Sequence, residues 1–586
     1  MVQPSPLSAC IDFVGSAADA GPLRLAFGAP RERLVAWTRA DVPSVLDAAE
    51  RHAKQGRWCV GFVRYEAAAA FDAACAVHVA DDARHGPLAW FSVHDEAQPW
   101  PAPSPAQRYE PLDWHSPWTR EQFESRIKRI HQAIADGEVY QVNLTAPLTS
   151  RFEGDAFALF EALRRAQPEA YAAFIDTGDE RILSVSPELF FDWRQGRVLC
   201  RPMKGTAPRG ATPDADRAHA AALAASEKER AENLMIVDLI RNDLSRVARP
   251  FSVKVPSLFE CRAWPTVWQM TSDVVARSRD GLTLAGLFGA LFPCGSVTGA
   301  PKLRAMHWIR ELESGSRGVC CGAIGLLQPG GAATFSVAIR TVVIRDGQAS
   351  CGIGSGITAD ATAQAEWQEW LHKRGFLERA RQPFQLLQTL RLQEGRYPAS
   401  ALHLQRLEEA ARHFGYCFSK ADAESALARV AQERPFGDWR VRLLVDAAGR
   451  AQADAMAFTP SDAPVDVQLA DAPVDAPQEF LRFKTTRREH YERFSPSRPG
   501  VFDTLLWNSR GEVTEFTRGN VIAELSDGRR ITPPLACGLL DGVGRALVLE
   551  SGVAAEAVLR LEDLPQVKQL WFVNSLRGML LAKCVG

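Results

Sequence analysis

The chain has 586 residues, of which 46% are hydrophobic and 24% are charged, and its formal net charge is -2. A chain of this length exceeds what one hydrophobic core usually serves, so we expect at least two domains. The nearly neutral charge gives no electrostatic reason to bind nucleic acid or an anionic membrane. No apolar run approaches the ~20 residues that span a bilayer, and the first residues lack a signal-peptide pattern.

Twelve cysteines are scattered along the chain without any Cys-x-x-Cys pair. Several of them, such as Cys320, Cys321 and Cys351, lie in apolar or glycine-rich surroundings. This pattern favours buried, reduced thiols over disulfides or zinc ligands. We therefore expect a cytoplasmic protein.

The first part of the chain, residues 1–98, alternates short apolar runs with turns. The proline-rich stretch 99–117 is too polar and too broken for regular structure, and it predicts a surface connector. From Thr119 onward, apolar residues at helical spacing predict a helix that Gly137 closes. Residues 139–144 then alternate like a strand.

Residues 226–246 have the period of a helix, and residues 333–344 are strand-like. The residues that we place on a common stripe of the helix are Leu234, Val237, Asp238 and Arg241. Strand–helix–strand units do not repeat regularly, so we expect an α+β fold rather than a doubly wound one. A charged helix gives way to a new strand near residues 380–383. The predicted parts of the chain are thus residues 1–98, 119–380 and 383–586.

One lysine stands out in the first two-thirds of the chain. In Met203-Lys204-Gly205-Thr206 it lies between an apolar residue and a Gly-Thr turn. An ammonium group is costly to place near a core, and the position is explained if the free amine must attack a substrate. Structural lysines are common, so this interpretation depends on the motifs around it.

Those motifs occupy residues 229–233, 237–244, 293–302, 340–341, 354–357 and 366–369. In this order the set resembles the chorismate-utilising enzymes, and the lysine at position 204 is typical of aminodeoxychorismate synthase component I. Anthranilate synthase looks the same but carries alanine there, so Lys204 disfavours it. The resemblance implies a two-sheet α/β sandwich with the site between mostly antiparallel sheets. It also implies that Lys204 attacks chorismate as a hydroxyl departs and that ammonia then expels the lysine.

Two pairs of glutamates have the same spacing. Glu229 and Glu232 are three apart on a predicted helix and share a face, as do Glu366 and Glu369. Either pair alone would be a solvated helix face, but inside the family's motifs the four carboxylates predict a Mg²⁺ site. By resemblance, Glu232 and Glu369 contact the metal, and the other two act through water. The metal would hold the ring carboxylate of chorismate.

Further residues are expected to bind the substrate. Arg340 suits a bidentate grip of the second carboxylate, and glycines nearby let backbone N–H groups approach an anion. The predicted substrate-binding set is Gly205, Thr206, Gln141, Gln269, Thr298, Lys302, Cys320, Arg340, Gly354, Ser355 and Gly356.

Three of these residues differ in type from those of related enzymes. Gln141 stands where isochorismate and salicylate synthases carry a lysine that activates water, and since glutamine cannot take a proton, it disfavours water chemistry. Gln269 replaces a histidine that the family often has near the leaving hydroxyl, so the proton must come from elsewhere or from metal-bound water. Cys320 replaces a substrate-side tyrosine, which removes a hydroxyl donor.

A second set of motifs occupies residues 384–390, 403–407, 440–443, 483–486, 512–520, 532–534, 538–543 and 574–578. In this order the set resembles the fold-type IV pyridoxal-phosphate enzymes, and most of all aminodeoxychorismate lyase. The resemblance implies pyridoxal 5'-phosphate as cofactor, with Lys484 as its Schiff-base lysine. Arg406 would bind the phosphate, and Glu515 would pair with the pyridine nitrogen. The remaining cofactor-binding residues are Asn520, Gly542, Val543 and Ser575.

Together the two resemblances imply 4-aminobenzoate synthesis, a step toward folate. Chorismate would be aminated to 4-amino-4-deoxychorismate, which would then lose pyruvate. The only Gly-x-Cys-x-Gly match, Gly318-Val319-Cys320-Cys321-Gly322, lies in the substrate-side motif of the chorismate-utilising set and not in an amidotransferase motif, so a separate glutamine amidotransferase subunit is expected to supply the ammonia. A class IV amino-acid aminotransferase in the second half stays open as an alternative. A non-catalytic scaffold would predict the loss of acidic or lysine positions, and none is lost.

Overall fold

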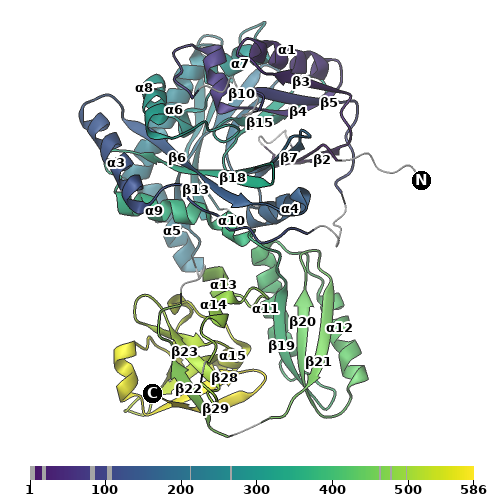
Figure 1. Cartoon of the computed structure of the whole chain (residues 1–586), viewed down its shortest axis with the longest axis vertical. Coiled ribbons are helices and arrows are strands. Elements are labelled where there is room, and N and C mark those ends of the chain that lie inside the picture. The colour runs from purple at the N-terminus through teal and green to yellow at the C-terminus, as the bar shows by residue number, and fades with distance from the viewer. Residues whose placement is uncertain are drawn as a thin grey trace. The chain divides into compact units, whose positions relative to one another are not determined.

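The structure is a computed structural model that describes residues 7–15, 21–78, 86–101, 108–210, 213–263, 267–460, 463–474, 478–496 and 498–585. It divides into two compact units, Met1–Pro383 and Phe384–Gly586. Figure 1 shows their elements, with the chain coloured from purple to yellow. No helix in the described ranges is long and apolar enough to cross a membrane.

The first unit contains two antiparallel sheets. The eight-stranded sheet has the order β14 (Gly299–Ala300), β6 (Gln141–Arg151), β18 (Gln348–Ile357), β17 (Thr341–Arg345), β8 (Glu180–Ser186), β7 (Tyr171–Asp176), β1 (Ala9–Phe13) and β2 (Leu23–Phe27). The ten-stranded sheet has the order β11 (Met203–Pro208), β13 (Val267–Arg277), β10 (Arg197–Arg201), β9 (Leu189–Arg194), β16 (Ala333–Val337), β15 (Ala323–Leu327), β4 (Trp58–Val63), β5 (Ala89–His94) and β3 (Glu32–Ala36), with β12 (Lys254–Ala263) paired to β13.

Helices cover the outer faces of both sheets. They are α1 (Asp41–Lys54), α2 (Ala68–Phe71), α3 (Arg120–Ala135), α4 (Ala156–Ala166), α5 (Pro213–Ala225), α6 (Glu227–Ser245), α7 (Leu284–Leu291), α8 (Lys302–Leu312), α9 (Ala363–Lys373) and α10 (Gly375–Arg379). In Figure 1, α1 and α7 lie beside the strands of the ten-stranded sheet, and α3 and α9 lie beside β6 and β18. One hydrophobic core lies between the two sheets, and in it Ile11 of the eight-stranded sheet packs with Phe62 and Ile324 of the ten-stranded sheet. The predicted two-sheet α+β architecture is confirmed.

The helix expected from Thr119 is α3. Thr119 is its N-cap, and together with Gln122 it forms a capping box, which satisfies two N–H groups that a helix end leaves without partners. Phe123 and Ile127 face the core. Gly137 has φ +75°, a conformation that glycine adopts without strain, and it ends the helix as predicted.

The strand-like segment 333–344 forms two strands. The chain forms β16 in the ten-stranded sheet, crosses over, and continues as β17 in the eight-stranded sheet. Arg340 lies at this crossing with φ +48°, which a strand does not allow. The apolar period runs through both strands because each is buried, so it gives no sign of the break.

Two smaller expectations also differ from the structure. On α6 the buried residues are Asn233, Ile236, Val237, Ile240, Asp243 and Leu244. Of the predicted stripe only Val237 is among them, and Leu234 is 51% exposed. In the proline-rich stretch 99–117, residues 102–107 lie outside the described residues, but Leu112 and Trp114 are buried against the eight-stranded sheet's core, so that part is not a surface connector.

The second unit contains a small sheet and a larger one. The small sheet is β19 (Leu386–Gln393), β20 (Asp438–Val445) and β21 (Ala451–Ala457), with α11 (Ser400–Phe414) and α12 (Lys420–Glu433). The larger sheet has the order β24 (Val513–Phe516), β23 (Asp503–Trp507), β22 (Val465–Leu469), β29 (Gly578–Cys584), β28 (Gln569–Asn574), β25 (Gly519–Glu524), β26 (Arg530–Thr532) and β27 (Ala555–Glu556). Because β24 also pairs with β25, six strands close into a ring around an apolar core. The helices of this part are α13 (Gln478–Arg482), α14 (Glu489–Glu492) and α15 (Val543–Glu550).

Candidate active sites

A β-bulge presents Lys204. Strand β11 pairs with β13 through Met203 and Thr206, but the register shifts between these two residues. Gly205, within the shift, has φ +88°. A bulge of this kind re-aims the side chains that it carries. The Lys-Gly-Thr sequence is therefore the local reason that Lys204 leaves the regular sheet surface.

Lys204 meets two residues of the other sheet. A Cβ atom added at Gly356 on β18 would lie 3.0 Å from Nζ of Lys204 and 1.8 Å from Nε2 of Gln141 on β6. Gln141 is fully buried, and neither of its amide atoms has a hydrogen-bond partner within the described ranges. An unpaired buried amide is costly, so it is suited to binding a polar ligand beside the lysine amine.

The predicted metal-binding carboxylates gather around the same lysine. Burial raises the pKa of Glu229 and of Glu232, and the positive charge of Lys204 opposes the rise at both. The carboxylate of Glu369 adds repulsion at both, so α6 and α9 bring their glutamates together. A Cβ atom added at Gly205 would lie 3.0 Å from Oε2 of Glu229, which places that carboxylate at the bulge.

These oxygens fit a magnesium ion only loosely. Glu366 accepts a hydrogen bond from Ser355 Oγ at 2.5 Å, and Oε1 of Glu369 is 2.7 Å from Nζ of Lys373. In the part of the chain that the structure describes, no three His, Cys, Asp or Glu residues are placed to hold a metal together. The donors therefore fit a Mg²⁺ ion that takes one or two protein carboxylates and keeps water and substrate oxygens. They do not fit a closed cage.

Glu188 is a site residue that sequence interpretation missed. It follows β8 and is 3% exposed, and its Oε1 has no hydrogen-bond partner among the described residues. Burial raises its pKa to about 7, although the Ser296 hydroxyl and the charge of Lys204 act against the rise. A carboxyl that titrates near neutrality beside an amine can accept or donate a proton. The available signal was a carboxylate directly after the apolar strand and a proline.

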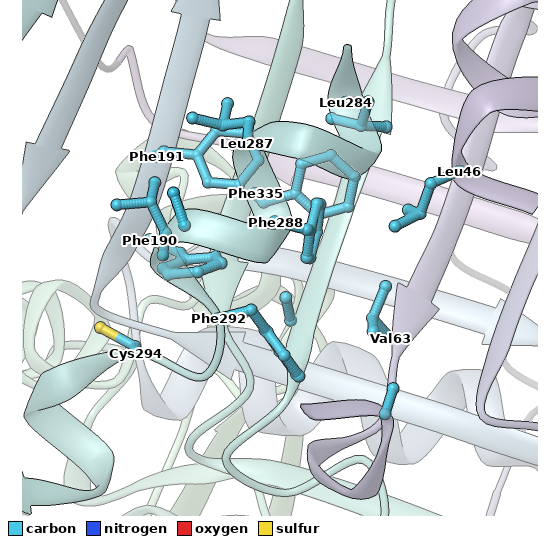
Figure 2. Close-up of a cluster of buried hydrophobic side chains, with 14 of the residues drawn as sticks. Leu46, Val63, Phe190, Phe191, Leu284, Leu287, Phe288, Phe292, Cys294 and Phe335 are labelled. Carbon is cyan, nitrogen blue, oxygen red and sulfur yellow. The ribbon is translucent and has the colours of Figure 1, made fainter. Parts of the chain in front are cut away.

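An aromatic cluster holds Glu188 in place. Figure 2 shows Phe190 and Phe191 of β9, two and three residues after Glu188, packed with Phe288 of α7. The ring centroid of Phe288 is 5.9 Å from that of Phe190 and 5.4 Å from that of Phe191. Cys294, also in Figure 2, belongs to this cluster and leads into the turn that carries Ser296. The core thus fixes two segments: strand β9, which begins just after Glu188, and the turn that carries Ser296.

Arg340 lies buried at the crossing between the sheets. Burial lowers its pKa to about 10. Its guanidinium donates a hydrogen bond to Gln167 Oε1, and within the described residues no carboxylate forms an ion pair with it. A buried cation without a counter-charge is suited to bind an anion such as a carboxylate.

Other predicted substrate residues are engaged within the protein. Nζ of Lys302 is 2.6 Å from Asp243 Oδ2, and Thr298 donates to the Cys294 carbonyl at 3.1 Å. Cys320 lines a separate cavity of about 150 Å³, and its Sγ is 3.8 Å from that of Cys321. Lys302 therefore lies in a structural ion pair.

The remaining predicted substrate residues flank the lysine. Thr206 pairs with Gln269 across β11 and β13. Gly354 faces the Leu144 carbonyl, which would be 2.4 Å from an added Cβ atom, and its own carbonyl accepts a hydrogen bond from Lys373. The two strands therefore approach too closely at this point for any side chain at position 354.

In the second unit, burial lowers the pKa of Lys484 well below its usual value. The positive charges of Arg488, Arg406 and Arg440 reinforce the effect, and Glu515 opposes it. The Lys484 carbonyl accepts a hydrogen bond from the Leu387 N–H at 2.9 Å, which ties this segment to β19. These surroundings favour a neutral, nucleophilic amine.

Glu515 on β24 is a buried carboxyl next to this amine. Burial raises its pKa to about 7. The Tyr491 hydroxyl donates to its Oε1 at 2.6 Å, and Asn520 Nδ2 lies 3.4 Å from Oε2. A carboxylate held in this way fits the ring nitrogen of a pyridoxal cofactor.

A second group of residues forms a cradle for a phosphate. Arg406 donates to Gln388 Oε1 at 2.6 Å and to the Asp541 carbonyl at 3.0 Å, and burial lowers its pKa to about 10. Beside it, burial lowers the pKa of His403 to about 2, and Nε2 of this ring is 2.9 Å from Ser575 Oγ.

The start of α15 completes this cradle. Gly542 is the N-cap of the helix and Val543 its first residue. A Cβ atom at Gly542 would lie 1.9 Å from Asn520 Oδ1, so only glycine fits there. A helix N-terminus next to an arginine without a carboxylate partner in the described chain fits a phosphate, so the residues present suit pyridoxal 5'-phosphate.

Two antiparallel sheets with a lysine between them define the first unit as an enzyme-like sandwich, and the second unit has the features of a pyridoxal-phosphate domain. Residues 24–379 match the chorismate binding enzyme family, and the chain belongs to that family. Residues 385–583 match the class IV amino-transferases, so the chain joins the two kinds of domain.

Several known proteins are similar to the first unit. Aminodeoxychorismate synthase component 1 of Salmonella typhimurium is 46% identical over 260 residues, which are 44% of this chain and 57% of that protein. The Escherichia coli protein of the same name is 42% identical over 261 residues, 44% and 58% of the two chains. Anthranilate synthase component 1 of Aquifex aeolicus is 38% identical over 268 residues, 46% and 54% of the two. The chain thus spans little more than half the length of these relatives.

Among solved structures, anthranilate synthase component I of Streptococcus pneumoniae superimposes with a TM-score of 0.52 at 25% sequence identity. The match covers 65% of this chain and 93% of that one. The putative isochorismate synthase of Bacillus anthracis gives the same TM-score at 18% identity and shares the fold.

Proposed function

We propose that the first unit aminates chorismate to 4-amino-4-deoxychorismate and that the second eliminates pyruvate from this product, giving 4-aminobenzoate. One observation carries the first half: the amine of Lys204 meets the unpaired amide of Gln141 at Gly356, with the carboxyl of Glu188 close by. Lysine, rather than alanine, at this position favours amination at C4 over anthranilate synthesis. The similarity to aminodeoxychorismate synthases supports the same assignment.

In the amination, Lys204 and Glu188 exchange protons with the substrate. The neutral amine of Lys204 bonds to ring carbon C2 as the C4–O bond breaks, and a proton from Glu188 turns the departing hydroxyl into water. Ammonia then bonds to C4 and expels the lysine, and it loses one proton. Arg340 holds one substrate carboxylate. Glu232 and Glu369 would hold Mg²⁺, which lowers the negative charge of the other carboxylate when bound.

In the elimination, Lys484 takes the proton from the carbon that bears the substrate amine. Burial lowers its pKa, which favours the free amine that this step needs. Arg406, Ser575 and the start of α15 would bind the cofactor phosphate, and Glu515 would keep the ring nitrogen protonated. Pyridoxal 5'-phosphate supplies an electron sink when bound. Loss of pyruvate makes the ring aromatic, which drives the reaction.

The second candidate for this unit is a class IV aminotransferase, since the match to that family covers both kinds of chemistry. Purified chain should be given aminodeoxychorismate, and pyruvate release should be followed with and without an added keto acid. A lyase releases pyruvate without the keto acid. If turnover requires it, the aminotransferase assignment replaces the lyase.

The ammonia source is proposed to be a separate glutamine amidotransferase subunit, which the name "component 1" of the relatives supports. Free ammonium salts at high pH should substitute for it. If the purified chain uses glutamine without a second protein, this part of the proposal is wrong.

A further inference from the structure

Three arginines near Lys484 have no part in the phosphate cradle. Arg440 lies on β20, Arg488 precedes α14, and Arg577 follows β28 by three residues. Arg440 and Arg488 both act on Lys484 through their charges, and Arg440 also acts on Arg577. Arg440 thus connects the group, because its charge reaches both the amine and Arg577.

None of the three has its charge neutralised. Nε of Arg440 is buried without a hydrogen-bond partner in the described chain, and the nearest acceptor of its Nη2 is Met456 Sδ at 3.6 Å. Burial and the neighbouring charges of Arg518 and Arg440 lower the pKa of Arg577. Arg488 donates only to a backbone carbonyl, that of Thr517, at 2.6 Å. Within the described residues, none of the three forms an ion pair with a carboxylate.

Aromatic rings orient these cations without cancelling them. The Arg577 guanidinium lies 5.1 Å from the ring centroid of Phe458 and 5.5 Å from that of Phe502, and Arg488 lies 4.5 Å from that of Tyr491. Cation–π contacts of this kind contribute only about 0.5–2 kcal/mol, so packing alone does not explain why like charges are gathered here. By contrast, the adjacent Arg518 pairs with Asp503 at 3.2 Å.

A cavity opens at Arg488, and Phe502, which forms part of its wall, also packs against Arg577. Its volume is about 540 Å³, and its lining includes Arg488, Tyr491, Phe502 and one carboxylate, Glu492. Cavities of about 300–1,000 Å³ are the size of small-molecule sites. The walls therefore offer aromatic surface for a ring and cations for its acidic substituents.

We propose that Arg440, Arg488 and Arg577 form a receptor for the carboxylates of an aromatic or cyclohexadiene dicarboxylate that carries the reacting amine. The inference rests on the proposed function, since it assigns a substrate class to the Lys484 site. A phosphate bound by Arg406 would leave this receptor free. An amino acid with one carboxylate would leave part of the arginine charge unanswered, so the receptor favours the dicarboxylate of a lyase.

The test is calorimetric binding of isophthalate and of benzoate to the holoenzyme. Wild type should bind isophthalate at least about 10-fold more tightly than benzoate, since charge-assisted hydrogen bonds contribute about 1.5–3 kcal/mol. Arg440→Gln and Arg577→Gln should each weaken isophthalate binding about 10-fold, and Arg577→Lys should restore part of it. The matched control is Arg529→Gln, at an exposed arginine that pairs with Asp527, and it should change nothing.

Equal affinities of wild type for the two ligands, no isophthalate binding, or unchanged binding in both glutamine variants would overturn the receptor. Circular dichroism of each variant excludes unfolding as the cause of a loss. Pyruvate release from aminodeoxychorismate is measured separately. If it is absent while the arginine variants lose isophthalate binding, the lyase fails and the receptor stands. If it persists with an unchanged KM in both variants, the receptor fails and the lyase stands.

Discussion

Gly356→Ala is the sharpest test of the Lys204 site, because the added methyl group meets side chains only. It would lie 1.8 Å from Gln141 Nε2 and 3.0 Å from Nζ of Lys204. Since comfortable contacts begin at about 3.5 Å, the Gln141 amide must move by about 1.7 Å. No backbone atom is among the nearest three, so the pairing of β18 with β6 should survive.

The expected loss follows from this displacement. A misplacement of about 1 Å at reacting groups costs about 10²-fold in rate, so amination should fall by at least that factor. Overpacking should destabilise the first unit by about 1–3 kcal/mol, partly offset by about 0.4–1 kcal/mol from the lower entropy of the unfolded chain. The folded fraction should therefore stay high while activity falls.

The assay is aminodeoxychorismate formation from chorismate and ammonium at saturating Mg²⁺, together with thermal unfolding. Gly375→Ala is the matched control, since a Cβ atom there meets nothing within 4 Å and Gly375 begins α10. Pyruvate release from aminodeoxychorismate by the second unit serves as an internal control in the same variant. Amination by Gly356→Ala at the wild-type rate would refute the placement of Lys204 and Gln141, and a loss that only tracks the unfolded fraction would do the same.

Four further outcomes are expected. Lys204→Ala should abolish amination, and mass spectrometry of wild type given chorismate without ammonia should find an adduct on the Lys204 peptide; an adduct elsewhere contradicts the nucleophile. Burial raises the pKa of Glu188 from 4.5 to about 7, so the folded chain binds an extra proton and stability falls as pH rises through that window. Glu188→Gln should remove this loss of about 3 kcal/mol in unfolding free energy between the two pH values, and it should also slow amination. An unchanged pH dependence of unfolding contradicts the assignment. Glu232→Gln and Glu369→Gln should each raise the Mg²⁺ concentration needed for half-maximal amination and spare pyruvate release; unchanged Mg²⁺ dependence places the metal elsewhere. Lys484→Ala should remove both the cofactor absorbance and pyruvate release, and persistent release means another base.

Local signals predicted the elements that depend on local physics. The cap at Thr119 and the period of Phe123 and Ile127 define α3 because each acts within a few residues. The predicted buried stripe of α6 was wrong because the strands that pack against this helix, β11 and β13, are separate segments of the chain. No local rule selects the face with Val237, which is buried, over the face with Leu234, which is exposed. The crossing at Arg340 between β16 and β17 could not be predicted from local signals either, because both flanking strands are apolar.

The site residues divide along the same line. Lys204 and the glutamate pairs are found from motif and spacing, because each motif holds its residues within one turn or helix. Burial alone raises the pKa of Glu188, against hydrogen bonds from the Ser296 hydroxyl and the Met203 backbone, and these partners follow 108 and 15 residues later in the chain. Likewise, the charge that acts on Arg577 comes partly from Arg440, which lies on another sheet. Burial and charge environment are tertiary quantities, so a residue's type and spacing do not contain them.

The two lysines are prepared for attack in opposite ways, and this difference assigns them different chemistry. Lys204 lies among the carboxylates of Glu229, Glu232 and Glu369, and any proton on its amine must pass to a base before the nitrogen can bond to carbon. Glu188, with a pKa near neutrality, is suited to be that base and then to return the proton to the leaving hydroxyl. Burial, reinforced by the charges of Arg488 and Arg406, lowers the pKa of Lys484 and favours a neutral amine before any substrate arrives. At Lys204 the same proton thus leaves the amine for Glu188 and then passes to the leaving hydroxyl. Lys484, by contrast, can accept a proton from carbon without a second acid.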